Sequence, residues 1–210
     1  STVWFEEIHA LEGLSFRTGW TSSAKYGIVR LVRIENLNEK PVRLEILDGA
    51  RNIMSAQCTA AMQSSKSVLL DAYKKSEVDA DANVALFSLS SVVTDKAEPS
   101  ECLYTNVSWF TTDDRVILSD SAVRAFVQGE PLAAGGELLG KRGECYILHE
   151  ADLKAKQAEC WEQVFDVNLD AVRLCALKAD VADRTQAWQK LLIDIKATDA
   201  ALTRRVAAAD

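Results

Sequence analysis

Histidine is scarce in this sequence, which limits the covalent and acid–base chemistry that the chain can carry. Among 210 residues only His9 and His149 are histidines, and a Ser or Cys nucleophile normally relies on such a base. His149 precedes Glu150 in a stretch that predicts a strand, and packing at a sheet edge explains it more simply than catalysis. The stretch GGELLGKRG at 135–143 matches neither GxxxxGK[ST] nor GxGxxG, which indicates a surface loop rather than a phosphate site. We predict no catalytic residue in this chain.

Acidic residues offer two other kinds of chemistry. Asp95, Glu98 and Glu101 in the loop DKAEPSE could flank a glycosidic bond, as paired carboxylates do in glycoside hydrolysis. Solvated loop charges are the simpler interpretation of these three residues. Asp79 and Asp81 have the residue type of calcium ligands, but the ligand order and the glycine of an EF-hand loop are missing, and turn formation accounts for them. We therefore predict no metal site and no cofactor.

Aromatic side chains are the remaining functional candidates, because sugar rings present apolar faces that stack on Trp and Tyr. Trp20, Tyr73, Tyr104 and Trp109 fall in or near loops and strands that could line a groove. Arg17, in the stretch SFRTGW, would add donors for sugar hydroxyls. Core packing is the competing interpretation for each ring taken alone. The carbohydrate-contact candidates that we predict are Arg17, Trp20, Tyr73 and Trp109.

Composition and charge restrict the partners. The chain is 48% hydrophobic and 26% charged, which is ordinary for a globular domain with a sizeable core. A formal net charge of −7 argues against a sequence-independent nucleic-acid surface, because phosphate binding needs clustered Lys and Arg. No apolar run reaches the roughly 18 residues that span a bilayer, and the start STVWFEEIHALEG lacks the plan of a signal peptide. We predict a cytoplasmic protein that binds neither nucleic acid nor membrane.

The five cysteines are widely spaced and form no CxxC pair, which argues against a disulfide framework and against a zinc site. Buried thiols in a reducing compartment are the simplest interpretation. The residues are Cys58, Cys102, Cys145, Cys160 and Cys175.

Short stretches of β-branched and alternating apolar residues dominate the chain up to residue 168. Residues 26–37 and 42–46 flank a turn, which predicts a hairpin. Residues 59–73 give a weaker helical or mixed signal. Several short strands in series, ending in a meander, indicate a sandwich rather than alternating βαβ units. The other predicted elements are strands at 83–93, 102–111, 116–118, 145–149 and 158–167, and a brief helix that is capped by Ser119 or Asp120, runs through Phe126 and ends before Gly129.

A helical pattern replaces the strand pattern after residue 168. From 169 to 209 there is no proline or glycine, and an apolar residue recurs every seven positions, which predicts one or two long helices docked on another surface. If this seam is buried, Trp188→Ala should cost about 3–5 kcal/mol. The predicted fold class is mainly β, with an antiparallel sandwich over 1–168 and a helical linker over 169–210. The seam consists of Leu174, Val181, Trp188, Ile195 and Leu202.

Several stretches of the chain resemble one family. HALEGLSFRTGW, RAFVQGEPL and KRGECYILHEADL resemble the sandwich region of large bacterial proteins related to cellobiose and chitobiose phosphorylases, and LTRRVAAAD resembles the linker to their catalytic barrel. The resemblance implies a galactose-mutarotase-like super-sandwich, incomplete at its N-terminus, followed after residue 210 by an (α/α)6 barrel with the catalytic acid. The chain departs from the family where NIMSAQC replaces a proline-containing turn.

The resulting functional hypothesis is a non-catalytic accessory domain of a glycoside phosphorylase or glycoside hydrolase, which positions the downstream barrel. The expected partners are that barrel, a weakly bound carbohydrate and, as the resemblance implies, a second copy of the chain. Two alternatives stay open. One is an independent glycan-binding module, which requires an exposed aromatic platform, and the other is a protein–protein interaction domain that uses the helical seam.

Overall fold

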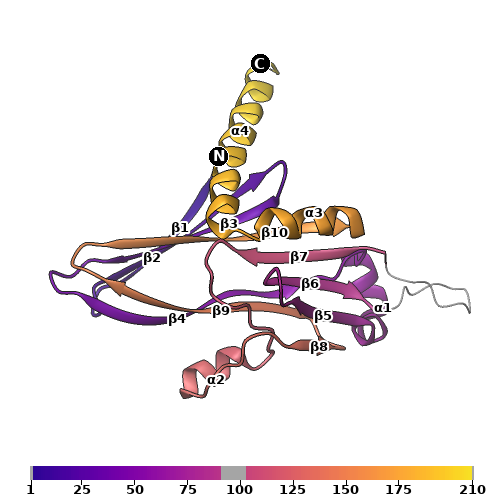
Figure 1. The fold of residues 1–210 in the computed structure, drawn as a ribbon, viewed down its shortest axis with the longest axis horizontal. Coiled ribbons are helices and arrows are strands. Elements are labelled where there is room, and N and C mark those ends of the chain that lie inside the picture. The colour runs from indigo at the N-terminus through magenta and orange to yellow at the C-terminus, as the bar shows by residue number, and fades with distance from the viewer. Residues whose placement is uncertain (1, 91–102, 210) are drawn as a thin grey trace, which may run out of the picture.

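The chain folds into two antiparallel β layers with helices on their outer faces (Figure 1). This computed structural model describes residues 2–90 and 103–209. The large sheet has eight strands in the order β1-β2-β3-β10-β7-β6-β5-β8, and the small sheet pairs β4 with β9. The mainly β class is confirmed. The strands are β1 (Val3–His9), β2 (Leu14–Ser23), β3 (Gly27–Asn36), β4 (Val42–Ile53), β5 (Lys74–Asp79), β6 (Val84–Leu89), β7 (Thr105–Phe110), β8 (Glu137–Leu139), β9 (Gly143–Leu153) and β10 (Ala158–Leu169).

The main core lies between the two sheets. Alternate residues of β9 point inward and pack against Phe87 of β6 and Trp161 of β10, as expected for strands with one face turned to another layer. The indole Nε1 of Trp161 donates to Asp48 of β4 over 2.7 Å, and Arg30 of β3 forms an ion pair with the same carboxylate. This buried charge pair is satisfied on both sides, so it fixes the position of β4 on the large sheet.

A second core lies on the opposite face of the large sheet, under α3 (Ala171–Val181) and α4 (Arg184–Ala207) (Figure 1). Asp170 and Asp183 cap the two helices by accepting hydrogen bonds from backbone N–H groups of the first turn. The prediction of one or two C-terminal helices is confirmed, and there are two. The distal part of α4 extends beyond the sheet, where its side chains are exposed.

The helical seam is only partly buried. The capped break before Arg184 resets the helix phase, so a seven-residue spacing that crosses the break does not define one face. Val181 is buried, but Trp188 and Leu202 are 41% and 48% exposed. The residues that α3 and α4 bury in the core are Leu177, Val181, Ala187 and Leu191.

The predicted hairpin of residues 26–37 and 42–46 is wrong in its pairing, although both strands exist. β3 pairs with β2 and β10 in the large sheet, whereas β4 pairs with β9 in the small one. The predicted closing meander fails in the same way, because β9 and β10 belong to different sheets. Strand propensity located these segments, but the pairing of β4 with β9 joins residues that are far apart in the sequence, such as Val42 with Leu153.

The remaining local predictions divide between confirmed and missed elements. The weak signal at 59–73 becomes α1 (Ala60–Ala72), with Thr59 as its N-cap. The brief helix is α2 (Ala122–Gln128), which begins one or two residues later than predicted, and it ends at Gly129 in the left-handed region at φ 68°. Instead of a strand at 116–118 there are only isolated bridges at Ile117. The sequence reasoning did not predict strands β1, β2, β5 and β8.

Candidate functional site

Polar side chains of β1, β2 and β3 form a row across the open end of the large sheet. Glu6 lies directly opposite Arg17, and Arg17 lies directly opposite Arg33. Directly opposed residues of antiparallel strands share a face. Arg33 is two residues from Leu31 on β3, so both side chains point to the same face, and Leu31 packs against the helix-covered core. The row therefore lies on the same face of the sheet as α3 and α4.

Hydrogen bonds hold this row in place. The Nε of Arg17 and the hydroxyl of Ser15 each donate to Glu6 Oε1 over 2.8 Å. The hydrogen bond from Arg17 is the main cause that lowers the pKa of Glu6, so this carboxylate is ionised near neutral pH. Arg33 donates to Glu35 over 3.0 Å. Two arginines and two glutamates thus balance one another within the row.

Trp4 gives the row an apolar wall. A Cβ at Gly19, which lies opposite Trp4, would be 2.8 Å from Trp4 Cε3, so glycine is what allows the indole to lie against the backbone of β2. The ring remains 50% exposed. Trp4, Glu6, Arg17 and Arg33 line an open cavity of about 510 Å³, which is within the usual range for small-molecule sites. We call it the Trp4 pocket.

The Trp4 pocket has the chemistry of a binding site. An ionised Glu6 has no proton to donate, and its salt bridge to Arg17 makes it a poor general base. Carboxylate acceptors and guanidinium donors around an exposed indole match the hydroxyls and the apolar face of a sugar ring. In the part of the chain that the structure describes, no group of three or more His, Cys, Asp or Glu side chains is arranged to hold a metal ion.

The four predicted carbohydrate-contact residues do not converge. Arg17 belongs to the Trp4 pocket, but Trp20 points to the opposite face of β2, where its ring stacks on Phe165 at a centroid distance of 6.2 Å. Tyr73 is the C-cap of α1, next to β5 and so toward the far edge of the sheet. Trp20 and Tyr73 are each partly accessible, but neither can share a site with Arg17.

Trp109 is a core residue and not a sugar platform. Its side chain is 0% exposed, packed against Tyr26 at 6.1 Å and under the guanidinium of Arg184 at 5.5 Å. Arg184 donates to the backbone oxygens of Ala82 and Asn83, and burial lowers its pKa to about 10. The prediction for Trp109 is corrected because helix α4 covers the strand face on which it lies.

Other candidate residues have structural roles or lie outside the description. Asp79 accepts from the backbone of Ala82 over 2.9 Å and pairs with Lys178, in agreement with a turn residue. Asp95, Glu98, Glu101 and Cys102 lie outside the described residues. Of the other cysteines, Cys145 is buried, Cys58 is half-buried, and Cys160 and Cys175 are exposed, so general burial of the thiols is not confirmed.

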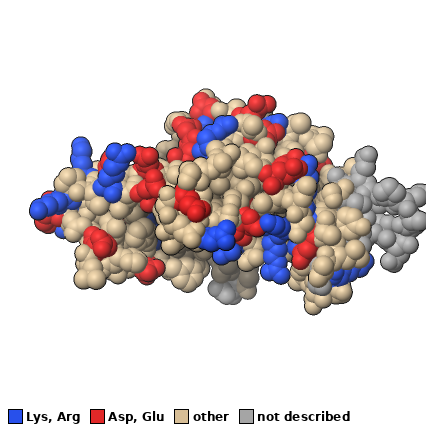
Figure 2. Space-filling view, turned by 90° about the horizontal axis from the view of Figure 1, so that it is seen from below, with Lys and Arg blue, Asp and Glu red and all other residues tan. Residues whose placement is uncertain are grey.

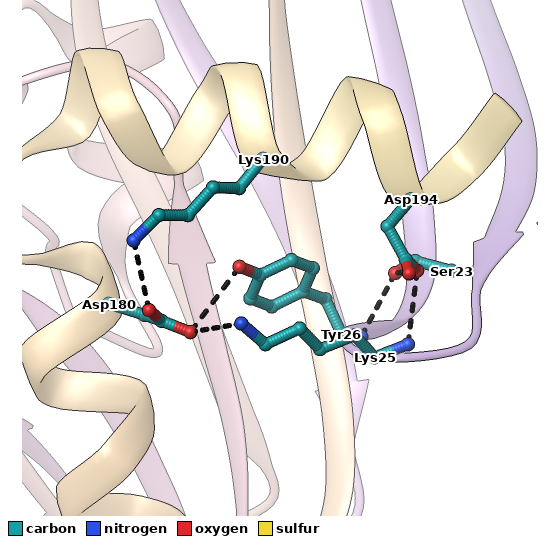
Figure 3. Close-up of polar contacts among 6 residues, drawn as sticks. All are labelled: Ser23, Lys25, Tyr26, Asp180, Lys190 and Asp194. Carbon is teal, nitrogen blue, oxygen red and sulfur yellow. Dashed lines mark hydrogen bonds and ion pairs between the residues drawn. The ribbon is translucent and has the colours of Figure 1, made fainter. Parts of the chain in front are cut away.

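A second polar cluster, at the turn between β2 and β3, fixes the two helices on the sheet (Figure 3). Asp194 of α4 accepts from the hydroxyl of Ser23 and from the backbone N–H of Lys25. Asp180 of α3 pairs with Lys25 and with Lys190 of α4. The ion pair with Lys25 is the main cause that lowers the pKa of Asp180. We call this cluster the helix anchor.

Comparisons with known proteins give little further identification. No family model matches the chain, and no curated protein matches it in sequence. Among the solved structures, a galactose mutarotase-like protein from Clostridium acetobutylicum is similar, with 10% identity and a TM-score of 0.33. The alignment covers 80% of this chain and 62% of that one, so the chain spans less than two thirds of its length. The description of the fold rests on the layers and strand order above, and the resemblance to phosphorylases stays a prediction.

Acidic and basic side chains are interspersed on the face that carries α2 (Figure 2). Among the helices within the described residues, none combines the length and apolar character needed to cross a membrane.

Proposed function

We propose that the chain is a non-catalytic β domain of a carbohydrate-active enzyme and that it contacts a neutral sugar through the Trp4 pocket. The observation that carries this proposal is the exposed indole of Trp4 beside the fixed Glu6–Arg17 pair. Because the charges of the row balance, hydroxyl groups suit the site better than phosphate or carboxylate groups. The absence of a proton donor at Glu6 agrees with a domain that binds sugar and leaves bond cleavage to another part of the enzyme.

The pocket predicts weak binding. One stacking ring and a few hydrogen bonds in an open cavity leave little net free energy after the cost of ordering the ligand. A dissociation constant in the millimolar range corresponds to a binding free energy of about −4 kcal/mol at 25 °C. A single half-exposed aromatic platform can supply this free energy. Such a site would steer or orient a glycan near a catalytic domain rather than capture it alone.

The helix anchor supports the accessory part of the proposal. It holds α4 against the β2–β3 turn through Asp194 and against α3 through Lys190, and the helix then extends past the sheet (Figure 1). A helix fixed at its middle and exposed at its end can set the orientation of a neighbouring domain.

Calorimetric titration with neutral β-linked disaccharides and oligosaccharides tests the sugar contact. Trp4→Ala should abolish the heat signal, and Arg17→Gln should weaken it, because each removes one component of the pocket. Trp20→Ala is the matched control, since Trp20 is an exposed tryptophan on the opposite face of the same hairpin. Equal loss in Trp4→Ala and Trp20→Ala, or tighter binding of a sugar phosphate than of the neutral sugar, would contradict the proposal.

Protein contact through α4 is the second candidate function. Leu202 and Val206, one helical turn apart near the end of α4, are 48% and 57% exposed and together present apolar surface that a partner would cover. Sedimentation of the parent chain and of Leu202→Glu tests this role. Association of the parent that is lost in the variant would support it, and a strictly monomeric parent would speak against contact with a second copy.

A further inference from the structure

His149 connects the two β layers at the end of the sandwich near the β9–β10 turn. Its Nδ1 lies 2.6 Å from Asp114 Oδ2, and its Nε2 lies 3.0 Å from Glu159 Oε1. Only 11% of its side chain is exposed, and its ring packs 4.7 Å from the ring of Trp161. Both ring nitrogens therefore face carboxylates in a largely enclosed position.

The three partners come from separate parts of the fold. His149 is on β9 of the small sheet, Glu159 is on β10 of the large sheet, and Asp114 is on the segment that joins β7 to α2. A neutral imidazole has one N–H donor, but an imidazolium has two. Only the protonated ring can donate to both carboxylates at once. Loss of the proton leaves one nitrogen as an acceptor that faces a carboxylate acceptor.

We propose that His149 is a proton-operated clamp, which joins the small sheet to the large sheet and to the β7–α2 segment when its ring is protonated and can hold only one of these two contacts at a time when it is not. Among the described residues, the charged groups that act on the ring are Asp114 and Glu159. Ile46, opposite His149 on β4, and Trp161 contribute apolar surface. Hydrogen bonding to Asp114 is the main cause that raises the pKa of His149, and Glu159 acts in the same direction.

The contribution of the clamp to stability is largest at low pH. Because the pKa in the folded state lies above the ordinary value of 6.5, the clamp is fully present below that value. It is lost as the pH rises through the higher pKa of the folded state. At high pH the β7–α2 segment is still held by Asn83. The side chain of Asn83 donates to the backbone oxygen of Asp114 over 2.8 Å and accepts from the N–H of Val116 over 2.9 Å. The expected change is therefore local loosening between the sheets and not release of α2.

Nuclear magnetic resonance titration of the two imidazole rings in the full chain tests the clamp. The His149 ring should titrate above 6.5, and both Asp114→Asn and Glu159→Gln should lower its pKa, with the larger change for Asp114→Asn. His9→Gln is the control, because His9 is the other histidine and is exposed. A His149 pKa at or below 6.5 in the parent chain, or one unchanged by both carboxylate variants, would overturn the proposal.

Amide hydrogen exchange gives an independent measure of the loosening. After correction for intrinsic rates, protection at residues 157–160 should fall between pH 6 and pH 9 in the parent chain, whereas Val116, whose N–H stays bonded to Asn83, should keep its protection. The protection at 157–160 should be insensitive to pH in His149→Gln. Equal protection at 157–160 at both pH values in the parent would also overturn the clamp, whereas failure of sugar binding at the Trp4 pocket would leave it unaffected.

Discussion

β7 and β1 belong to the same sheet, yet their side chains have opposite environments. β7, with the sequence TNVSWF, buries Thr105 and Ser108 together with Trp109. β1, with the sequence VWFEEIH, exposes all seven residues, including Trp4 and Phe5. β1 has four apolar residues among seven and β7 has three among six, so apolar content does not explain why one strand is exposed and the other buried.

The difference shows that layers, and not strand composition, decide burial in this protein. β7 has the small sheet over one face and α3 and α4 over the other, whereas β1 is the outermost strand and contributes no residue to either core. An apolar side chain at such an edge is available to a ligand. The same reasoning separates Trp109, a core residue, from Trp4, a candidate platform.

The sharpest test of this comparison is the stability of two Trp→Ala variants. Trp109→Ala removes a fully buried ring and should lower the free energy of unfolding by about 3–5 kcal/mol. Trp4→Ala removes a half-exposed ring at the edge and should cost less than about 1 kcal/mol. Denaturant unfolding of both variants measures the difference. Similar losses in the two variants would mean that β1 is covered in solution.

The helix anchor should have the next largest effect, because it holds the layer that buries β7. Asp194→Ala leaves the Lys25 N–H and the Ser23 hydroxyl without their charged acceptor and should cost about 1–3 kcal/mol. Asp152→Ala is the control, since the Asp152 carboxylate is 79% exposed and its ion pair with Arg43 is long, at 3.9 Å. Such surface ion pairs contribute about 0–1 kcal/mol. Thermal unfolding that gave equal shifts for the two variants would contradict an anchoring role for Asp194.

The exposure of Trp188 on α4 lies between that of Trp109 on β7 and that of Trp4 on β1. Because 41% of the side chain is exposed, Trp188→Ala should cost about 1–2 kcal/mol and not the 3–5 kcal/mol expected for a buried seam. Burial is the main cause that raises the pKa of Glu162, and a hydrogen bond from Trp188 partly opposes this. Trp188→Phe, which keeps an aromatic ring at this position but removes the N–H donor, should therefore raise the pKa of Glu162 further. Chemical denaturation and titration of the Glu162 carboxyl by carbon-13 resonance check both expectations.

Helix boundaries were predictable from the sequence, because caps and breakers act within a few residues. The end of α2 at Gly129 and the helices after residue 168 follow from capping and from the absence of breakers. Pairing was not predictable in the same way, because β3 and β4 are separated by a five-residue turn but lie in different sheets. β1 and β2 were not predicted, because neither shows a clean alternation of apolar and polar residues.

The candidate site was predictable only through Arg17. Glu6 and Arg33 come into contact range of Arg17 through the register of three strands, which no short sequence motif records. Trp109 looked like a platform because the sequence does not show that α4 crosses its strand. One signal was available for Trp4: a glycine inside a strand, such as Gly19, often marks a site of close approach.

The most direct test of the central claim is to follow the five tryptophan indole N–H resonances during titration with a neutral β-linked oligosaccharide. The five rings lie in different environments: Trp4 at the pocket, Trp20 on the opposite face, Trp188 on α4, and Trp109 and Trp161 in the cores. Sugar bound at the Trp4 pocket predicts a saturable shift of the Trp4 resonance and little change in the other four. A saturable shift confined to Trp20, or no shift at millimolar sugar, would contradict the account.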